Sequence, residues 1–392
     1  MDPTHSSFGR TLLGLLLTPW LAHTAQADVL HVPAQFALLQ DAIAAAAPGD
    51  VILIEGGTHE DVVIDKPLHL AGHATDRPLF TPLEWDGSLP FDTTPAVTLA
   101  GPGQGAVTLS AIDFGGSTGS VFATQNTPAI EGGGFGELRL LHCDIQAPTW
   151  VDPQPGDVRD PISAVDVDVS WLLIEDSVVR GTNGFVLTTW SGDELRAGEP
   201  AVASTGDVCV VDSDVLGTDG LISPLLTLGL DCSAAGGNGG AGVETPGTLY
   251  QADSLIAGGA GAMAFLASDG TLVCDQPDGP AAQVGALVDD LGSALTSSGP
   301  AVNGSTWSLT FEADDSFLVV SPALDQPQPL SVGLLFMDPT LLRLIPVAGS
   351  GRVRFDVGVV AGHGSVGLPI AVQAYSATLG LSRPVFASIL LP

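Results

Sequence analysis

The stretch GDVILIEGGTHEDVVIDKPLHLAG, residues 49–72, carries the pattern that decides the fold. Two β-branched runs, Val51–Ile54 and Val62–Ile64, flank a Gly-Gly turn, and a third apolar segment ends at Gly72. Short β-rich runs bounded by glycine and polar residues are typical of strands joined by tight turns. The stretch therefore predicts three short strands in succession.

A repeat of this kind continues through the middle of the chain. The prolines Pro95, Pro128 and Pro161 are 33 residues apart, and each precedes an apolar marker. Ankyrin repeats have a similar period, but they need two helices per unit, and these units show no helical periodicity. The repeat predicts stacked coils of two or three short parallel strands. Five strand-like runs share one register, at residues 107–116, 138–147, 172–181, 208–217 and 249–258.

One helix is expected, over residues 33–50, PAQFALLQDAIAAAAPGD. Phe36, Leu39, Ile43 and Ala47 lie on one face of it, and a Pro-Gly pair ends it. Because an open end of stacked coils exposes unpaired strand edges, this helix is predicted to be an N-terminal cap.

The N-terminus has the order of a secretory signal peptide, predicted to span residues 1–27. A basic residue, Arg10, precedes an apolar run over residues 11–22, and Ala25-Gln26-Ala27 forms the cleavage site. The apolar run is shorter than the roughly 20 residues that a membrane-spanning helix needs. A secreted protein, extracellular or at the cell surface and without a membrane span, is expected.

The charge of the chain restricts its partners. There are 44 acidic and 11 basic residues, and the formal net charge is −33. Such a chain repels nucleic acids, anionic membranes and polyuronates. A polyuronate would need recruitment through a metal, so calcium is the one cofactor that the sequence leaves open. Four cysteines allow three disulfide pairings or free thiols, and the sequence does not choose among them: Cys143, Cys209, Cys232 and Cys274.

The chain resembles the right-handed parallel β-helix, or pectate-lyase-like, superfamily of secreted bacterial proteins. The features that carry the resemblance are the export signal, the LQDAI helix, residues 49–72 and the degenerate coils that follow. The resemblance is close over residues 38–72 and implies a right-handed parallel β-helix over residues 28–300. It does not imply an activity, since the motif sets of pectin methylesterases, polygalacturonases and pectate lyases are not found.

The last part of the chain, residues 305–392, changes character. Alternating apolar segments such as WSLTFEA and GRVRFDVGVV recur with turns between them. This pattern predicts a C-terminal antiparallel β-sandwich module, and it makes the whole protein all-β. Attachment, export and capping of the solenoid end all remain open as roles for the module.

Acidic residues recur at matching positions of the aligned repeats. Asp113, Asp144 and Asp214 fall in one column, and a second column two residues earlier holds His142, Asp176, Asp212 and Asp253. Since residues two apart share a face of a strand, the two columns are expected to point outward from one parallel sheet.

These columns suggest two alternatives. As an enzyme site, Asp176, Asp212 and Asp214 would supply the acid and base for polysaccharide cleavage, with His142 as accessory proton donor. Otherwise the aspartates recur because they form turns and keep a surface soluble.

The leading hypothesis is a monomeric surface or matrix protein with a structural role or weak carbohydrate or calcium binding. The alternative is a polysaccharide lyase or glycoside hydrolase acting on this aspartate face.

Overall fold

The computed structural model describes residues 27–82, 94–115, 117–118, 127–147, 149–150, 158–186, 195–222, 237–261, 277–289, 291–292, 295–297, 300–321, 324–331, 333–337, 342–359, 369–376 and 378–390. In this part of the chain the protein is all-β, with parallel sheets followed by an antiparallel region, as predicted. The expected signal peptide lies almost entirely outside the described residues.

The first sheet has twelve strands, and every pair in it is parallel. Partners in neighbouring strands lie one repeat apart in the sequence, so that Leu138 pairs with Leu172, Leu172 with Val208 and Val208 with Leu249. We call the contribution of one repeat a rung. The strands are β1 (Val29–Val32), β2 (Val51–Ile54), β4 (Val62–Ile64), β5 (His69–Ala71), β7 (Val97–Ala100), β8 (Ala106–Ser110), β11 (Ile130–Leu141), β15 (Val165–Glu175), β19 (Val202–Ser204), β20 (Asp207–Val211), β23 (Val243–Ala252) and β25 (Ala282–Val288).

The second sheet has seven strands, also all parallel. Its side chains alternate, with Ile145, Val179 and Val215 buried in a core that they share with the first sheet. The strands are β3 (Gly57–Glu60), β6 (Pro78–Thr81), β9 (Asp113–Phe114), β12 (Asp144–Gln146), β16 (Val178–Arg180), β21 (Asp214–Leu216) and β24 (Leu255–Ala257). Short two-stranded pairs lie beside these sheets: β10 (Ser117–Thr118) with β13 (Thr149–Trp150), β14 (Val158–Arg159) with β17 (Phe185–Val186), and β18 (Leu195–Arg196) with β22 (Leu221–Ile222).

A tight bend joins the two sheets in the five rungs from β8 and β9 to β23 and β24. Its first residue has a positive φ: 53° at Ala111, 55° at His142, 44° at Asp176, 48° at Asp212 and 46° at Asp253. Aspartate adopts this left-handed conformation more readily than most residues other than glycine and asparagine. The repeated aspartate of the second column is thus explained by backbone geometry.

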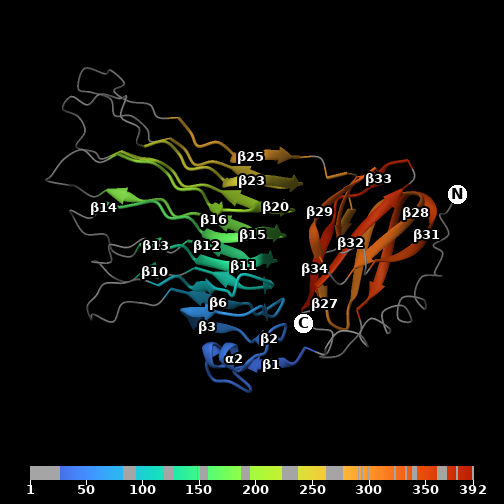
Figure 1. The fold of residues 1–392 in the computed structure, drawn as a ribbon, viewed down its shortest axis with the longest axis horizontal. Coiled ribbons are helices and arrows are strands. Elements are labelled where there is room, and N and C mark those ends of the chain that lie inside the picture. Colours follow the sequence, from blue (N-terminus) through green and yellow to red (C-terminus); the bar gives the residue numbers. More distant parts are fainter. Residues whose placement is uncertain are drawn as a thin grey trace.

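The N-terminal helix covers the first rungs, and it is shorter than predicted. Helix α2 spans Leu39–Ala45, and residues 33–35 form a turn before it. Leu39, Ala42 and Ile43 are buried in the shared core, whereas Ala47 is exposed. The helix contacts β1, β2 and β4 at the base of the stack in Figure 1, the end at which the cap was expected.

The C-terminal region is a mainly antiparallel sheet that lies beside the parallel stack (Figure 1). Strands before residue 305 already belong to it, since Leu295–Ser297 pairs with the long strand β28. One pair, β27 with β34, is parallel. The strands are β26 (Leu295–Ser297), β27 (Ala301–Val302), β28 (Thr306–Ser321), β31 (Arg343–Gly358), β32 (Pro369–Ser376), β33 (Gly380–Leu381) and β34 (Val385–Leu390), with a separate hairpin of β29 (Leu324–Leu330) and β30 (Gly333–Met337).

Candidate functional site

The residues of each predicted column do occupy equivalent positions in successive rungs, but one column lies in the second sheet and the other in the bend. The register places Asp113, Asp144 and Asp214 in one row of the second sheet, with Val178 between the last two. His142, Asp176 and Asp212 lie in the bend, not in a strand. The expectation that both columns point outward from one sheet is therefore wrong, because the left-handed bend changes the direction of the chain between them.

Asp214 lies in a strand of the second sheet, whereas the other predicted catalytic residues lie in the bend. It is an exposed residue of β21. In the same row, Asp113 forms an ion pair with Arg77 at 3.1 Å, and Asp144 lies 3.8 Å from Arg180. This row is a solvated face in which basic side chains relieve the repulsion between acids on adjacent strands.

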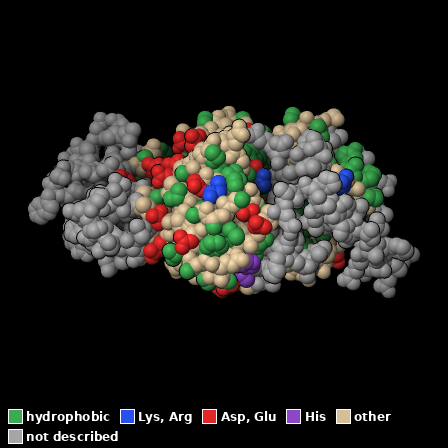
Figure 2. Space-filling model, turned by 60° about the horizontal axis from the view of Figure 1, so that its bottom comes forward, with side chains coloured by type: hydrophobic (Ala, Val, Ile, Leu, Met, Phe, Trp, Pro, Cys, Tyr) green, Lys and Arg blue, Asp and Glu red, His purple; other side chains and the backbone are tan. Residues whose placement is uncertain are grey.

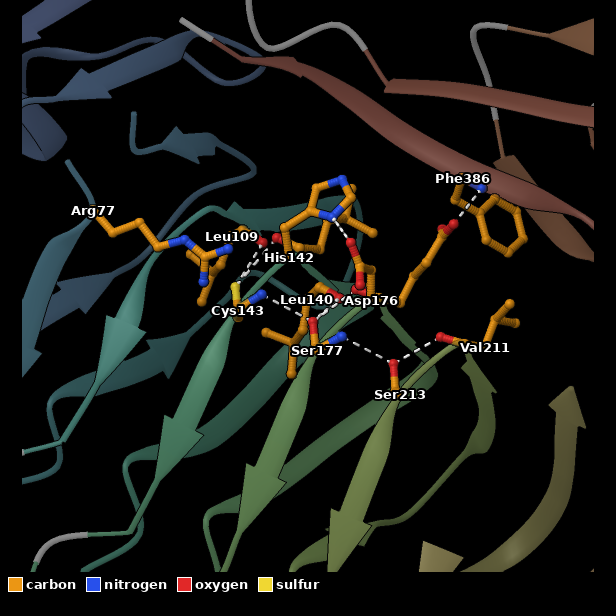
Figure 3. Close-up of polar contacts among 12 residues, drawn as sticks. Arg77, Leu109, Leu140, His142, Cys143, Asp176, Ser177, Val211, Ser213 and Phe386 are labelled. Atoms are coloured by element: carbon orange, nitrogen blue, oxygen red, sulfur yellow. Dashed lines mark hydrogen bonds and ion pairs between the residues drawn. The ribbon is translucent and has the colours of Figure 1, made fainter. Parts of the chain in front are cut away.

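His142 and Asp176 come from neighbouring rungs and contact each other. Nδ1 of His142 lies 2.8 Å from Oδ2 of Asp176, and the imidazole is buried, as Figure 3 shows. The buried Nε2 atom of His142 has no hydrogen-bond partner among the described residues. The carboxylate thus fixes the orientation of the imidazole ring.

Behind the bend, a ladder of hydroxyl groups connects the rungs. The Cys143 backbone N–H donates to Ser177 Oγ at 2.9 Å, the Ser177 N–H to Ser213 Oγ at 3.1 Å, and the Ser213 N–H to Ser254 Oγ at 3.2 Å. Each hydroxyl in turn donates to the carbonyl two residues before it, at Glu175, Val211 and Ala252. Figure 3 shows the part of the ladder that involves Cys143, Ser177 and Ser213. The ladder satisfies backbone groups that the bend removes from the sheets.

The C-terminal sheet packs against the outer face of the first parallel sheet just before the bend, and we call this contact the joint. Leu141, Leu173 and Val211 of the parallel sheet are buried there. A row of four aromatic rings crosses the joint. The centroid distances are 5.7 Å from Trp171 to Tyr250, 6.2 Å from Tyr250 to Phe336 and 6.1 Å from Phe336 to Phe386.

Polar contacts of the joint involve the predicted catalytic column directly. Arg383, whose side chain is 4% exposed, places Nη1 3.2 Å from Asp212 Oδ1 and also pairs with Asp253. Its Nε donates to the Leu295 carbonyl at 3.0 Å. From the parallel sheet, Glu175 Oε1 accepts the backbone N–H of Phe386 at 2.8 Å. The bend is therefore held by a distant part of the chain.

Burial in the joint changes the proton affinities of two acids. Desolvation raises the pKa of Glu175 well above its ordinary value, although the Phe386 N–H and Arg383 act in the other direction. Desolvation also raises the pKa of Asp212, and Arg383 opposes this shift. Glu175 Oε2 has no partner among the described residues.

The sequence reasoning missed Glu175, Arg383 and Phe386 as members of this site. A signal for the joint was present, because strand runs such as LLIE and VCVV do not alternate. A strand that is apolar on both sides is typically buried on both faces. In agreement, Val208 and Val210 lie in the shared core, while Cys209 and Val211 lie in the joint.

A groove of about 620 Å³ lies on the same strands farther from the bend, at the bulges of the first sheet. It is lined by Gly103, Gly134, Phe135, Asp168, Val169, Ser170, Thr205, Gly206, Asp207, Pro246 and Gly247. None of the four predicted catalytic residues lines it. The groove and the predicted catalytic column are thus separate places on the molecule.

The predictions on metal and cysteine have mixed outcomes. Within the described residues, no group of three or more His, Cys, Asp or Glu side chains could hold a metal ion. Calcium binding stays a prediction. Cys143 and Cys209 are free and buried, and desolvation raises the pKa of the Cys143 thiol to about 12. Cys232 and Cys274 lie outside the described residues.

Chemically, the bend site can orient an imidazole and hold an arginine, and the groove presents carboxylates and hydroxyls. The catalytic assignment of Asp176, Asp212, Asp214 and His142 stays a prediction.

In the part of the chain that the structure describes, no helix is long and apolar enough to cross a membrane. Comparison with known proteins finds no family model, no curated protein and no solved structure that matches this chain.

Proposed function

We propose that this protein is a secreted scaffold of the cell surface or extracellular matrix, a monomeric right-handed parallel β-helix with weak carbohydrate binding. One observation carries the proposal: Asp212, one of the aspartates predicted to be catalytic, and Asp253 of the same column hold Arg383 of the C-terminal sheet. An acid that anchors a buried guanidinium is not free to exchange protons with a substrate. The second column is thus assigned to structure.

The register supports the β-helix part of the proposal. The same number of residues separates the paired strands of the two sheets in successive rungs, from Leu138 to Gln146, from Leu172 to Arg180 and from Val208 to Leu216. A chain that returns to the same two parallel sheets once per repeat is what a solenoid requires.

The surface charge supports the proposed setting. Acidic side chains are spread over the face in Figure 2, with few basic ones among them, in keeping with the net charge of −33. Such a surface keeps a protein soluble and repels other polyanions.

The test combines activity with stability. Wild type, Asp214→Ala and the double variant Asp212→Ala/Asp253→Ala would be incubated with a panel of neutral and acidic glycans, with and without Ca²⁺, and products measured. The free energy of unfolding would be measured on the same samples. We expect no product from any of them. The double variant should lose about 3–5 kcal/mol, because it leaves the Arg383 charge buried without a partner.

Asp214→Ala is the matched control, since it removes an exposed acid and should change stability by about 0.5 kcal/mol or less. The proposal fails if wild type forms a product and the double variant loses that activity while keeping its stability. That result would instead support the lyase or hydrolase alternative.

A further inference from the structure

The groove crosses successive rungs at right angles to the strands. Hydrogen bonds of its lining residues connect the rungs. The Gly103 N–H donates to the Gly134 carbonyl, and Thr205 Oγ1 donates to Asp168 Oδ1 at 2.6 Å. Asp207 Oδ1 accepts the N–H of Thr248, the residue that follows the lining residue Gly247, at 2.7 Å. Since neighbouring strands are about 4.8 Å apart, five rungs extend over roughly 20 Å. A hollow whose lining comes from five successive rungs fits a linear polymer better than a compact ligand.

Glycine contributes main chain to the groove lining. A Cβ atom at Gly103 would meet nothing within 4 Å, so Gly103 faces open space. At Gly206 a Cβ atom would lie 2.3 Å from the carbonyl oxygens of Val169 and Ser170, so the backbone of adjacent rungs approaches closely there. Main-chain groups therefore form part of the lining.

The charge of the lining narrows the ligand class. Asp168 and Asp207 carry carboxylates, Ser170 and Thr205 carry hydroxyls, and none of the described lining residues is basic. Each carboxylate uses one oxygen for the hydrogen bond given above and keeps further acceptor sites, since an ionised carboxylate has about four. Within the described residues neither Asp168 nor Asp207 forms an ion pair, unlike Asp113 or Asp212.

We propose that the groove binds a linear polysaccharide whose sugars carry protonated amino groups, lying along the axis of the stack. This inference rests on the proposed carbohydrate-binding scaffold and names the glycan class. Ammonium groups pair with Asp168 and Asp207, and sugar hydroxyls donate to the remaining carboxylate and carbonyl oxygens. A polyuronate is repelled by the same carboxylates.

The test measures binding of glucosamine oligomers of increasing length by calorimetry, using the full chain. Fully N-acetylated oligomers and polygalacturonate serve as uncharged and anionic probes. We expect glucosamine oligomers to bind, with affinity rising until the oligomer spans the groove. Asp168→Asn and Asp207→Asn should each weaken binding about tenfold, the equivalent of one ion pair of about 1.4 kcal/mol. Both variants keep an acceptor oxygen for the internal hydrogen bond.

Asp166→Asn is the matched control, because Asp166 is exposed, lies two residues before Asp168 on β15 and does not line the groove. Equal losses in Asp166→Asn and Asp168→Asn would overturn the proposal, since binding would then follow the overall charge. Absence of binding, or equal binding of the N-acetylated oligomer, would overturn it too. Absence of binding to every glycan would also remove the carbohydrate-binding part of the proposed function, whereas its scaffold part is tested separately, by product formation at the bend.

Discussion

Among single residues, Glu175 shows most clearly how the joint changes chemistry. Its carboxyl group is buried, accepts the Phe386 N–H and lies near the carboxylates of Asp176 and Asp212. A lone buried carboxylate is costly, so such a group binds a proton more tightly than in water. The Arg383 guanidinium is the nearby charge that opposes this effect.

The raised pKa of Glu175 predicts a pH dependence of stability. Its pKa in the folded protein lies above the ordinary 4.5, so its contribution to the free energy of unfolding is complete below that pH. The contribution is lost as the pH rises toward the folded-state value, because only the unfolded chain ionises freely. Glu175→Gln keeps an acceptor for the Phe386 N–H but cannot ionise.

Unfolding free energies of wild type and Glu175→Gln, measured over a pH series, check this. The two proteins should be similar in acid, and wild type should become the less stable one as the pH rises. Parallel curves would show that Glu175 has an ordinary pKa.

At the scale of the element, the bend and its serine ladder determine how the two parallel sheets meet. The left-handed residue turns the chain. The hydroxyl of the serine that follows accepts a backbone N–H from the preceding rung and donates to the carbonyl at its own strand end. Cys143 takes the serine's place in one rung, where its Sγ lies 3.4 Å from the Leu141 carbonyl oxygen. A thiol is a weak donor, so this rung is connected less strongly than the rungs that carry serine.

Removing one step of the ladder should be costly. Ser177→Ala leaves the buried Cys143 N–H without its acceptor, and a loss of about 1–3 kcal/mol in unfolding free energy is expected. Cys143→Ser places a hydroxyl at the position that serine occupies in the later rungs, so it should lower the unfolding free energy less than Ser177→Ala does. Denaturant titration of both variants decides this, and a greater loss for Cys143→Ser would contradict the role of the ladder.

The elements also show how far the sequence could predict the structure. The repeat, the parallel strands and the columns of Asp113, Asp144 and Asp214 followed from local pattern, because parallel stacking brings equivalent residues of successive repeats together. The bend was mistaken for a strand, since period-two alternation continues through a single left-handed residue. The joint was not predicted because its contacts join distant segments: Glu175 and Phe386 are 211 residues apart.

For the molecule as a whole, strand β34 shows that the C-terminal sheet is buried on both faces where it meets the joint. Val385, Ala387 and Ile389 point into a core of its own, while Phe386 points into the joint. All residues of β34 are buried for this reason. The two parts of the protein therefore share apolar surface, and unfolding of one part should weaken the other.

Two phenylalanines of the C-terminal sheet region test this coupling. Phe336 is 0% exposed in the joint, and Phe336→Ala should cost about 3–5 kcal/mol and make the joint accessible to protease. Phe317 is 39% exposed, and Phe317→Ala should change stability by about 0.5 kcal/mol or less. Limited proteolysis and denaturant unfolding would measure both. Equal behaviour of the two variants would mean that the joint adds no stability.

The constant length of the bend has a consequence for protein engineering. From Leu138 to Gln146, and in the matching part of each later rung, no residue is gained or lost, whereas the stretches that follow Gln146, Arg180 and Leu216 differ in length. Foreign peptides grafted after these three positions would leave the pairing register unchanged. The stack would then display several inserted epitopes in one line, at a spacing determined by the distance between strands.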